Sequence, residues 1–204
     1  MAVICLLVGL AVGYLLRGSA TDQVAVTSPA AQASAGAGIG SNMQVTPEQL
    51  KHMADKQAEP MLQQLKARPN DPTLLANLGN LYYDAQQFQD AVSHYERSLK
   101  LNPLNTNVRT DLGTAYWYLG DADRAIQEFQ TALKTEPNKP NTLMNLGIVQ
   151  WRGKLDAKAA VAAWQKLLAT NPGFEGRSQV EQLITEAKRH GDIKPGTKTD
   201  KPAM

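Results

Sequence analysis

Few side chains in this sequence have the chemistry of a catalyst or a metal ligand. The three histidines, His52, His94 and His190, lie far apart, and none has a cysteine or an acidic partner at ligand spacing. His94 is predicted to face solvent, because it directly precedes Tyr95, which is predicted to be buried. The single cysteine, Cys5, lies in an apolar segment, which excludes an intramolecular disulfide and a cysteine metal cluster. Catalytic and phosphate-binding motifs are absent from the sequence. The sequence therefore predicts that the protein is not an enzyme and uses no metal or cofactor.

Three aromatic side chains recur at one spacing and have the chemistry of a binding surface. Tyr83, Trp117 and Trp151 stand 34 residues apart. Large aromatic residues that face solvent are typical anchors for a bound peptide. Aromatic residues at junctions between repeated units instead fill space. Both interpretations stay open for these three residues, and the first predicts a ladder of anchors along one surface.

The segments that carry these aromatic residues repeat with the same period. Leu-Gly pairs stand at 78–79, 112–113 and 146–147, and a fixed period of this length is typical of stacked units that cannot fold singly. Leu75, Leu78 and Tyr82 are separated by three and four residues, so they share one face of a helix. A closing proline then ends a second helix, because the residue before proline disfavours helical conformation. Each unit is therefore predicted to be a pair of amphipathic helices.

This arrangement resembles the tetratricopeptide repeat (TPR) family. The resemblance rests on Leu-Gly-x-x-Tyr, Ala-x-x-x-aromatic and a closing proline, and it extends over about residues 72–172. It implies an all-α fold, an α-solenoid of three TPR helical hairpins at 72–105, 106–139 and 140–173. The third unit needs one inserted residue near Gly153, so we expect its inner turn to be reshaped.

The resemblance also implies where a partner would bind. The concave surface of a TPR superhelix is lined by positions one and four residues past the glycine of each unit, together with flanking positions. The predicted peptide-binding groove of this chain therefore consists of Asn77, Asn80, Tyr83, Asp111, Thr114, Trp117, Asn145, Ile148, Trp151 and Arg152. Asparagine amides both donate and accept hydrogen bonds, which suits an extended peptide backbone.

Segments at both ends of the array are predicted to cap it. Residues 46–71 predict an N-terminal helical cap that opens with Thr46 and Gln49 as a capping box, and Pro60 is expected to kink or break this helix. Residues 174–191 predict a C-terminal capping helix with one apolar face. Residues 192–204 are rich in lysine, proline and threonine and predict a disordered tail.

The N-terminal segment has the character of a membrane element on a tether. Fifteen uncharged residues at 2–16 are short for a bilayer-spanning helix, which needs about 17–25 residues. Residues 1–17 therefore predict either a transmembrane anchor or a signal segment cleaved at the small residues 18–20. Residues 18–45 predict a disordered Ala/Gly/Ser linker. This composition favours an exported domain on the periplasmic side of the membrane.

Together these features predict a membrane-anchored TPR scaffold that binds a protein or peptide partner in its concave groove. Residues 160–168 resemble the last repeat of the TPR subunit of bacterial cytochrome c maturation, which implies an assembly factor for exported proteins such as c-type cytochromes. The alternative is a structural module that associates with itself and has no peptide ligand. A net charge of +2 without a basic stripe argues against nucleic acid as a partner.

Overall fold

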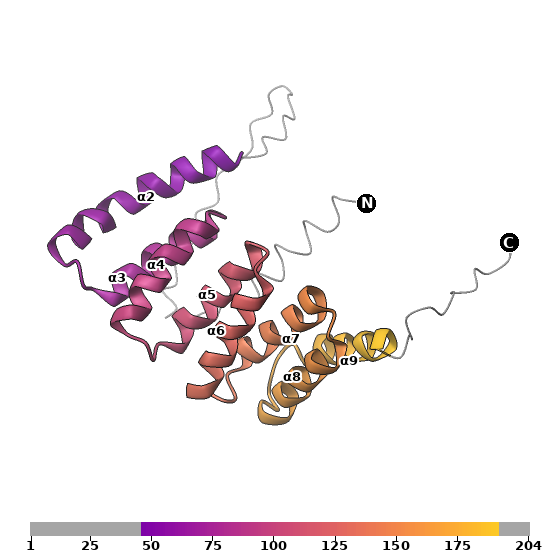
Figure 1. Cartoon of the computed structure of the whole chain (residues 1–204). Helices are drawn as coiled ribbons and strands as arrows, with labels where there is room; N and C mark the ends of the chain where they lie inside the picture. The colour runs from indigo at the N-terminus through magenta and orange to yellow at the C-terminus, as the bar shows by residue number, and fades with distance from the viewer. Residues whose placement is uncertain (1–45, 192–204) are drawn as a thin grey trace, which may run out of the picture.

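The computed structural model describes residues 46–191. The predicted anchor or signal segment, linker and tail, at 1–17, 18–45 and 192–204, lie outside the described residues. Within 46–191 the chain forms eight helices and no strand: α2 (Pro47–Ala67), α3 (Pro72–Asp84), α4 (Phe88–Leu101), α5 (Thr106–Tyr118), α6 (Ala122–Thr135), α7 (Pro140–Lys154), α8 (Ala157–Thr170) and α9 (Arg177–Gly191). Figure 1 shows them along a single array, from α2 (indigo) to α9 (yellow).

The helices pack in the order in which they occur along the chain. Three hairpins, α3 with α4, α5 with α6, and α7 with α8, form the repeated units, and each second helix also packs on the first helix of the next unit. At the two ends, α2 packs on α3 and α9 packs on α8. The predicted all-α solenoid of three hairpins with a helix at each end is therefore confirmed.

Side-chain caps fix where most of these helices begin. The side chains of Asp71, Asn105, Asp121 and Asp156 accept hydrogen bonds from backbone N–H groups in the first turns of α3, α5, α6 and α8. These bonds satisfy donors that have no partner within the helix. At the start of α2, Thr46 forms the capping box that the sequence predicts.

The predicted break at Pro60 is wrong, because α2 runs through this residue without interruption. A proline inside a helix removes the hydrogen bond to the carbonyl four residues earlier, which belongs to Lys56. Both Pro60 and Lys56 are exposed, so water can replace the lost bond. On the opposite face Ala54 and Ala58 are buried, and these small residues hold both halves of α2 against the array.

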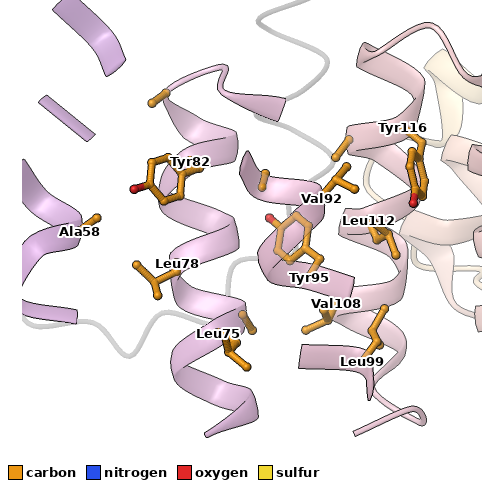
Figure 2. Packing of buried hydrophobic residues seen from close by; sticks show 14 of the residues in the cluster. Ala58, Leu75, Leu78, Tyr82, Val92, Tyr95, Leu99, Val108, Leu112 and Tyr116 are labelled. Atoms are coloured by element: carbon orange, nitrogen blue, oxygen red, sulfur yellow. The ribbon is translucent and has the colours of Figure 1, made fainter. Parts of the chain in front are cut away.

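Close helix crossings explain the repeated glycine. A Cβ atom added to Gly79 would lie 2.4 Å from Cδ1 of Tyr95, and one added to Gly113 would lie 2.7 Å from Cε1 of Phe129. Both aromatic rings come from the second helix of the same unit and are buried. Only glycine lets the two backbones approach this closely. Figure 2 shows buried side chains of α3, α4 and α5, which belong to one hydrophobic cluster.

The inner turn of the third unit differs from the other two, as the sequence predicts. In each inner turn one residue has a positive φ: Gln86 at 60°, Gly120 at 82° and Leu155 at 55°. A backbone hydrogen bond closes the first two turns over five residues, from Gln87 to Tyr82 and from Asp121 to Tyr116. The third is closed over six residues, from Asp156 to Gln150. The inserted residue therefore lengthens α7. It also leaves a leucine in the left-handed region, at a cost of about 1 kcal/mol.

Among residues 46–191, none of the helices combines the length and the apolar character that crossing a bilayer requires.

Candidate functional site

The first helices of the three units line one continuous surface. Besides their contacts with the second helices, α3 contacts α5 and α5 contacts α7 directly. Elements approach their neighbours most closely on the inner side of a curved stack. The first helices therefore form the inner face of the array, and all ten residues of the predicted groove lie on these three helices.

Tyr83 lies where α3, α4 and α5 meet. Its half-buried ring is 5.5 Å from the ring of Phe88 and 5.9 Å from that of Tyr118, both in edge-to-face geometry. Burial raises the pKa of Tyr83, and the neighbouring Tyr118 and Asp111 raise it further. The phenol therefore stays neutral and keeps its proton as a hydrogen-bond donor. Because the ring spans two units, Tyr83 fills a junction while part of it faces solvent.

The two tryptophans of the same column also reach the next unit. A Cβ atom added to Gly153 on α7 would lie 2.7 Å from Cζ3 of Trp117, so the indole of Trp117 packs against one side of this glycine. The ring of Trp151 lies 5.8 Å from that of Trp164 on α8 and 6.2 Å from that of His190 on α9. Both tryptophans are half-buried. All three aromatic residues thus pack at junctions, and each leaves part of its surface in solvent.

Three polar residues of the predicted groove bond within the array. The Asn80 side-chain oxygen accepts a hydrogen bond of 2.8 Å from the hydroxyl of Tyr95. Asn145 is buried, and its amide nitrogen donates to the hydroxyl of Thr114 across 3.1 Å between α7 and α5. Asn80 therefore holds the two helices of its own unit together, and Asn145 and Thr114 hold adjacent units together.

The remaining members of the predicted groove are more accessible. Asn77 and Arg152 are exposed, and Asp111 and Ile148 are half-buried. The guanidinium of Arg152 lies 6.0 Å from the centroid of the Trp151 ring, at the outer limit of a cation–π contact. Asp111 lies close enough to Tyr83 to influence its pKa. The structure thus places acidic, aromatic and basic side chains along one face.

The structure shows a further exposed column beside the predicted groove that was not predicted from the sequence. Asp84, Tyr118 and Arg152 are all exposed and stand 34 residues apart, one position after the aromatic column. Of these only Arg152 is in the predicted set. The Tyr118 ring is 40% exposed and stacks on the ring of Phe88 with centroids 4.7 Å apart. The 34-residue period places these three residues at equivalent positions in the units. Because the three differ in residue type, no repeated residue pointed to them in the sequence.

Two family models match the chain, and both describe a tetratricopeptide repeat. One matches residues 72–135 and the other residues 110–173, so together they cover 72–173, which is half of the chain. The chain belongs to the tetratricopeptide repeat family. The matched segment contains all six helices of the three TPR hairpins, from α3 to α8. The predicted resemblance is confirmed for the repeats.

Solved structures share this TPR fold at low sequence identity. A crystal structure of MamA has a TM-score of 0.57 and 22% identity, covering 71% of this chain and 92% of MamA. The translocator chaperone SycD of Yersinia enterocolitica has a TM-score of 0.56 and 13% identity, covering 60% and 95%. The first TPR of Spaghetti (RPAP3), bound to an HSP90 peptide, has a TM-score of 0.52 and 17% identity, covering 57% of this chain and 93% of that structure. No curated protein matches the chain.

The histidine in the first TPR has a structural role. His94 was predicted to face solvent, but its ring is half-buried and stacks on the ring of Tyr82 with centroids 5.4 Å apart. Burial lowers the pKa of His94, and the nearby Arg97 lowers it further, so the ring stays neutral. Across residues 46–191, no three His, Cys, Asp or Glu side chains come together as metal ligands would.

Proposed function

We propose that this TPR protein is a scaffold that binds an extended segment of a partner protein along the inner face of α3, α5 and α7. The observation that carries the proposal is the exposed column of Asp84, Tyr118 and Arg152. The glycine column that allows the close helix crossings keeps one residue type in all three units. The exposed column is instead acidic in the first unit, aromatic in the second and basic in the third. The fold does not require that variation, which instead suits recognition of a defined sequence of side chains.

The groove residues divide into three roles under this proposal. Tyr83, Trp117 and Trp151 form the half-buried floor, where aromatic rings offer apolar contact area. The hydrogen bonds of Asn80, Thr114 and Asn145 position the helices that carry the floor. Direct polar contact with the partner is left to the more accessible side chains, which are Asn77, Asp84, Asp111, Tyr118 and Arg152.

The chemistry of this face disfavours an acidic C-terminal tail as the ligand. Some TPR modules clamp a terminal carboxylate with lysine and arginine side chains. The equivalent positions here hold Ala76, Thr110 and Met144, which are 8%, 4% and 3% exposed. None of them can present a positive charge. A partner segment with both charge signs and a central aromatic or aliphatic side chain fits the column better.

Self-association without a peptide ligand is the alternative function. End-to-end stacking of copies would need apolar outer faces on the terminal helices. The exposed faces of α2 and α9 instead carry polar residues such as Lys56 and Gln63 on α2 and Gln182 and Glu186 on α9. Such faces close a repeat array. This observation favours the binding function over extension by stacking.

Photocrosslinking can separate the two functions in one experiment. A photoreactive amino acid is placed in the full chain at Asn77 on the inner face or, as a matched control, at Gln130 on α6; both sites are exposed. We expect the Asn77 probe to form an adduct with a defined segment of another protein, and the Gln130 probe to form none. Adducts composed of two copies of this chain at Asn77 would establish self-association instead.

We propose further that residues 2–16 tether the scaffold to a membrane and place it on the periplasmic side. The support comes from the uncharged apolar sequence of this segment. The likeness of residues 160–168 to a cytochrome c maturation subunit suggests exported proteins such as c-type cytochromes as clients. A c-type cytochrome in the Asn77 adduct would support that role, and an unrelated client would overturn it.

Deleting residues 2–16 is expected to move the protein from the membrane fraction to the soluble fraction, because the deletion removes the one long uncharged apolar run. Fractionation and immunoblotting of full-length and shortened chains measure this shift. N-terminal sequencing of the full-length protein provides the control. A soluble mature protein that begins near Thr21 would show that the segment is a cleaved signal and would contradict the tether.

A further inference from the structure

The last TPR and the C-terminal helix meet at one edge of the array. The turn between α7 and α8 lies at this edge, and α9 runs back toward it, antiparallel to α8. A Cβ atom added to Gly191, the last residue of α9, would lie 3.4 Å from Cβ of Ala157, the first residue of α8. The ring contact between Trp151 and His190 fixes the same arrangement. The end of α9 and the turn between α7 and α8 therefore lie at the same edge of the array.

We call this surface the terminal edge and define it by five exposed residues: Lys154, Leu155, Lys158, Lys188 and Arg189. Leu155 is 84% exposed, more than any other large apolar residue in the described part of the chain. It also has a φ of 55°, a conformation that glycine adopts without strain. A leucine side chain therefore protrudes into solvent at a position where its exposure and its left-handed backbone conformation both disfavour leucine.

Positive charge predominates around Leu155. Of the nearby carboxylates, Asp123 pairs with Lys154 at 2.7 Å, and Asp156 caps α8 by accepting a hydrogen bond of 2.9 Å from the N–H of Ala159. Glu186 is the acidic residue in the last turns of α9. The inner turns of the first two units carry Asp84, Asp90 and Asp121, of which Asp90 pairs with Lys51 at 3.8 Å and Asp121 with Arg124 at 2.5 Å. The basic character is therefore local to the terminal edge.

We propose that the terminal edge docks on the anionic surface of a lipid bilayer, with Leu155 entering the headgroup region. Lys158, Lys188 and Arg189 complement a negatively charged leaflet, while the charge of Lys154 is offset by Asp123. Each Lys or Arg held near such a surface strengthens binding roughly fivefold. A single protruding aliphatic side chain adds contact with the acyl boundary. Long lysine side chains suit this setting because their stems lie along apolar material while the ammonium groups stay in water.

The shape of the terminal edge favours a bilayer over an acidic peptide. A peptide ligand is held in a concave site with several fixed contacts. Here the central apolar side chain projects outward from a turn, and the cations around it are exposed. A flat, fluid and uniformly charged surface matches that geometry. This docking is independent of the groove, because none of the five residues belongs to the predicted peptide-binding set.

Hydrogen–deuterium exchange on the full chain can test the proposal. Exchange is followed for residues 152–158 and 186–191 with vesicles of phosphatidylcholine alone and with vesicles that also contain phosphatidylglycerol. Residues 2–16 can attach to both kinds of vesicle, so the difference between them isolates the effect of charge. We expect slower exchange in both segments only with the anionic vesicles. Equal protection on both kinds of vesicle, or protection on neither, would overturn the proposal.

Variants make the test specific to the terminal edge. The double variant Lys158→Glu with Arg189→Glu removes two cations. It should weaken the binding of the terminal edge to anionic vesicles at least roughly 25-fold. The matched control, Lys100→Glu with Lys134→Glu, changes two exposed lysines at the opposite edge and should leave protection unchanged. Equal loss with both pairs would indicate a general charge effect and contradict the assigned site.

Leu155→Gly tests the apolar contact without straining the turn, since glycine accepts the positive φ. The variant should bind anionic vesicles more weakly while its melting temperature stays the same or rises. Unchanged vesicle binding would remove Leu155 from the proposal. A soluble glutamate-rich peptide provides the last comparison: if it protects the two segments as strongly as anionic vesicles do, the partner is an acidic protein and the bilayer is excluded.

Discussion

Replacing Gly147 with alanine is expected to lower the melting temperature of the protein by about 10 °C. The added Cβ atom would lie 2.2 Å from Nε1 of Trp164, which is fully buried. That nitrogen donates a hydrogen bond of 3.1 Å to the backbone oxygen of Met144. The methyl group must displace the indole and break this bond. Overpacking and a lost buried hydrogen bond together cost about 3 kcal/mol of unfolding free energy.

Gly173→Ala is the matched control for this variant. A Cβ atom at Gly173 meets no heavy atom within 4 Å, so the same chemical change occurs without a clash. Its melting temperature should stay within about 3 °C of wild type. Thermal unfolding of the three proteins, followed by circular dichroism, makes the comparison. If Gly147→Ala melts with wild type, α7 and α8 do not cross closely and the assigned unit geometry is wrong.

Trp117→Ala is expected to destabilise the protein by about 2 kcal/mol. Truncation of a fully buried tryptophan costs about 3–5 kcal/mol, and Trp117 is half-buried at the junction of α5 and α7. Its indole packs against Gly153, where a Cβ atom would lie 2.7 Å from the ring and 2.9 Å from Cβ of Ala122. The loss therefore arises from packing between the second and third units.

A double-mutant cycle with Gly153→Ala identifies the contact. In an otherwise wild-type chain, the methyl group of Gly153→Ala contacts both Trp117 and Ala122. In the Trp117→Ala background the indole, which is the larger of these two groups, is absent. Gly153→Ala should therefore cost less in the Trp117→Ala background, with a coupling energy of at least about 0.5 kcal/mol. Chemical denaturation of the four proteins supplies the values. Additive effects would show that the indole does not pack against this glycine.

The repeat period was sufficient to predict the fold because it reports which positions face the core. Gly79, Gly113 and Gly147 recur where helices cross, and the aromatic residues that oppose them recur with the same spacing. Closing prolines and capping side chains mark the helix ends locally, so neighbouring sequence is enough to place them. Even the altered turn at Leu155 was visible as one residue inserted into an otherwise constant period.

The sequence predictions that were wrong have a different physical origin, which is the packing of helices against one another. Pro60 was expected to kink or break its helix, but no break occurs. Whether the helix can continue depends on whether the unpaired carbonyl faces solvent, which tertiary packing decides. His94 was expected in solvent, but its ring stacks on the ring of Tyr82 of α3 and is half-buried. The repeat period does not report which contacts a residue makes with other helices or with solvent.

The exposure and hydrogen bonding of the candidate groove residues were predicted only in part for the same reason. Asn145 and Thr114 have the types of ligand contacts, yet they bond to each other because α5 and α7 adjoin. Tyr118 lies beside Trp117 in the sequence and was not selected, because its counterparts Asp84 and Arg152 are of other types. Whether a position is exposed depends on the relative placement of the units, which one sequence does not define.

The most direct test of the binding function compares affinity and stability for the exposed column. The partner segment captured by the Asn77 probe is synthesised, and its Kd is measured for the full-length protein, for Tyr118→Ala, for Arg152→Ala and for the control Gln130→Ala. We expect the first two variants to bind at least roughly tenfold more weakly, with melting temperatures within about 3 °C of wild type. Gln130→Ala should match wild type in both measurements. Unchanged affinity in Tyr118→Ala and Arg152→Ala would contradict the groove.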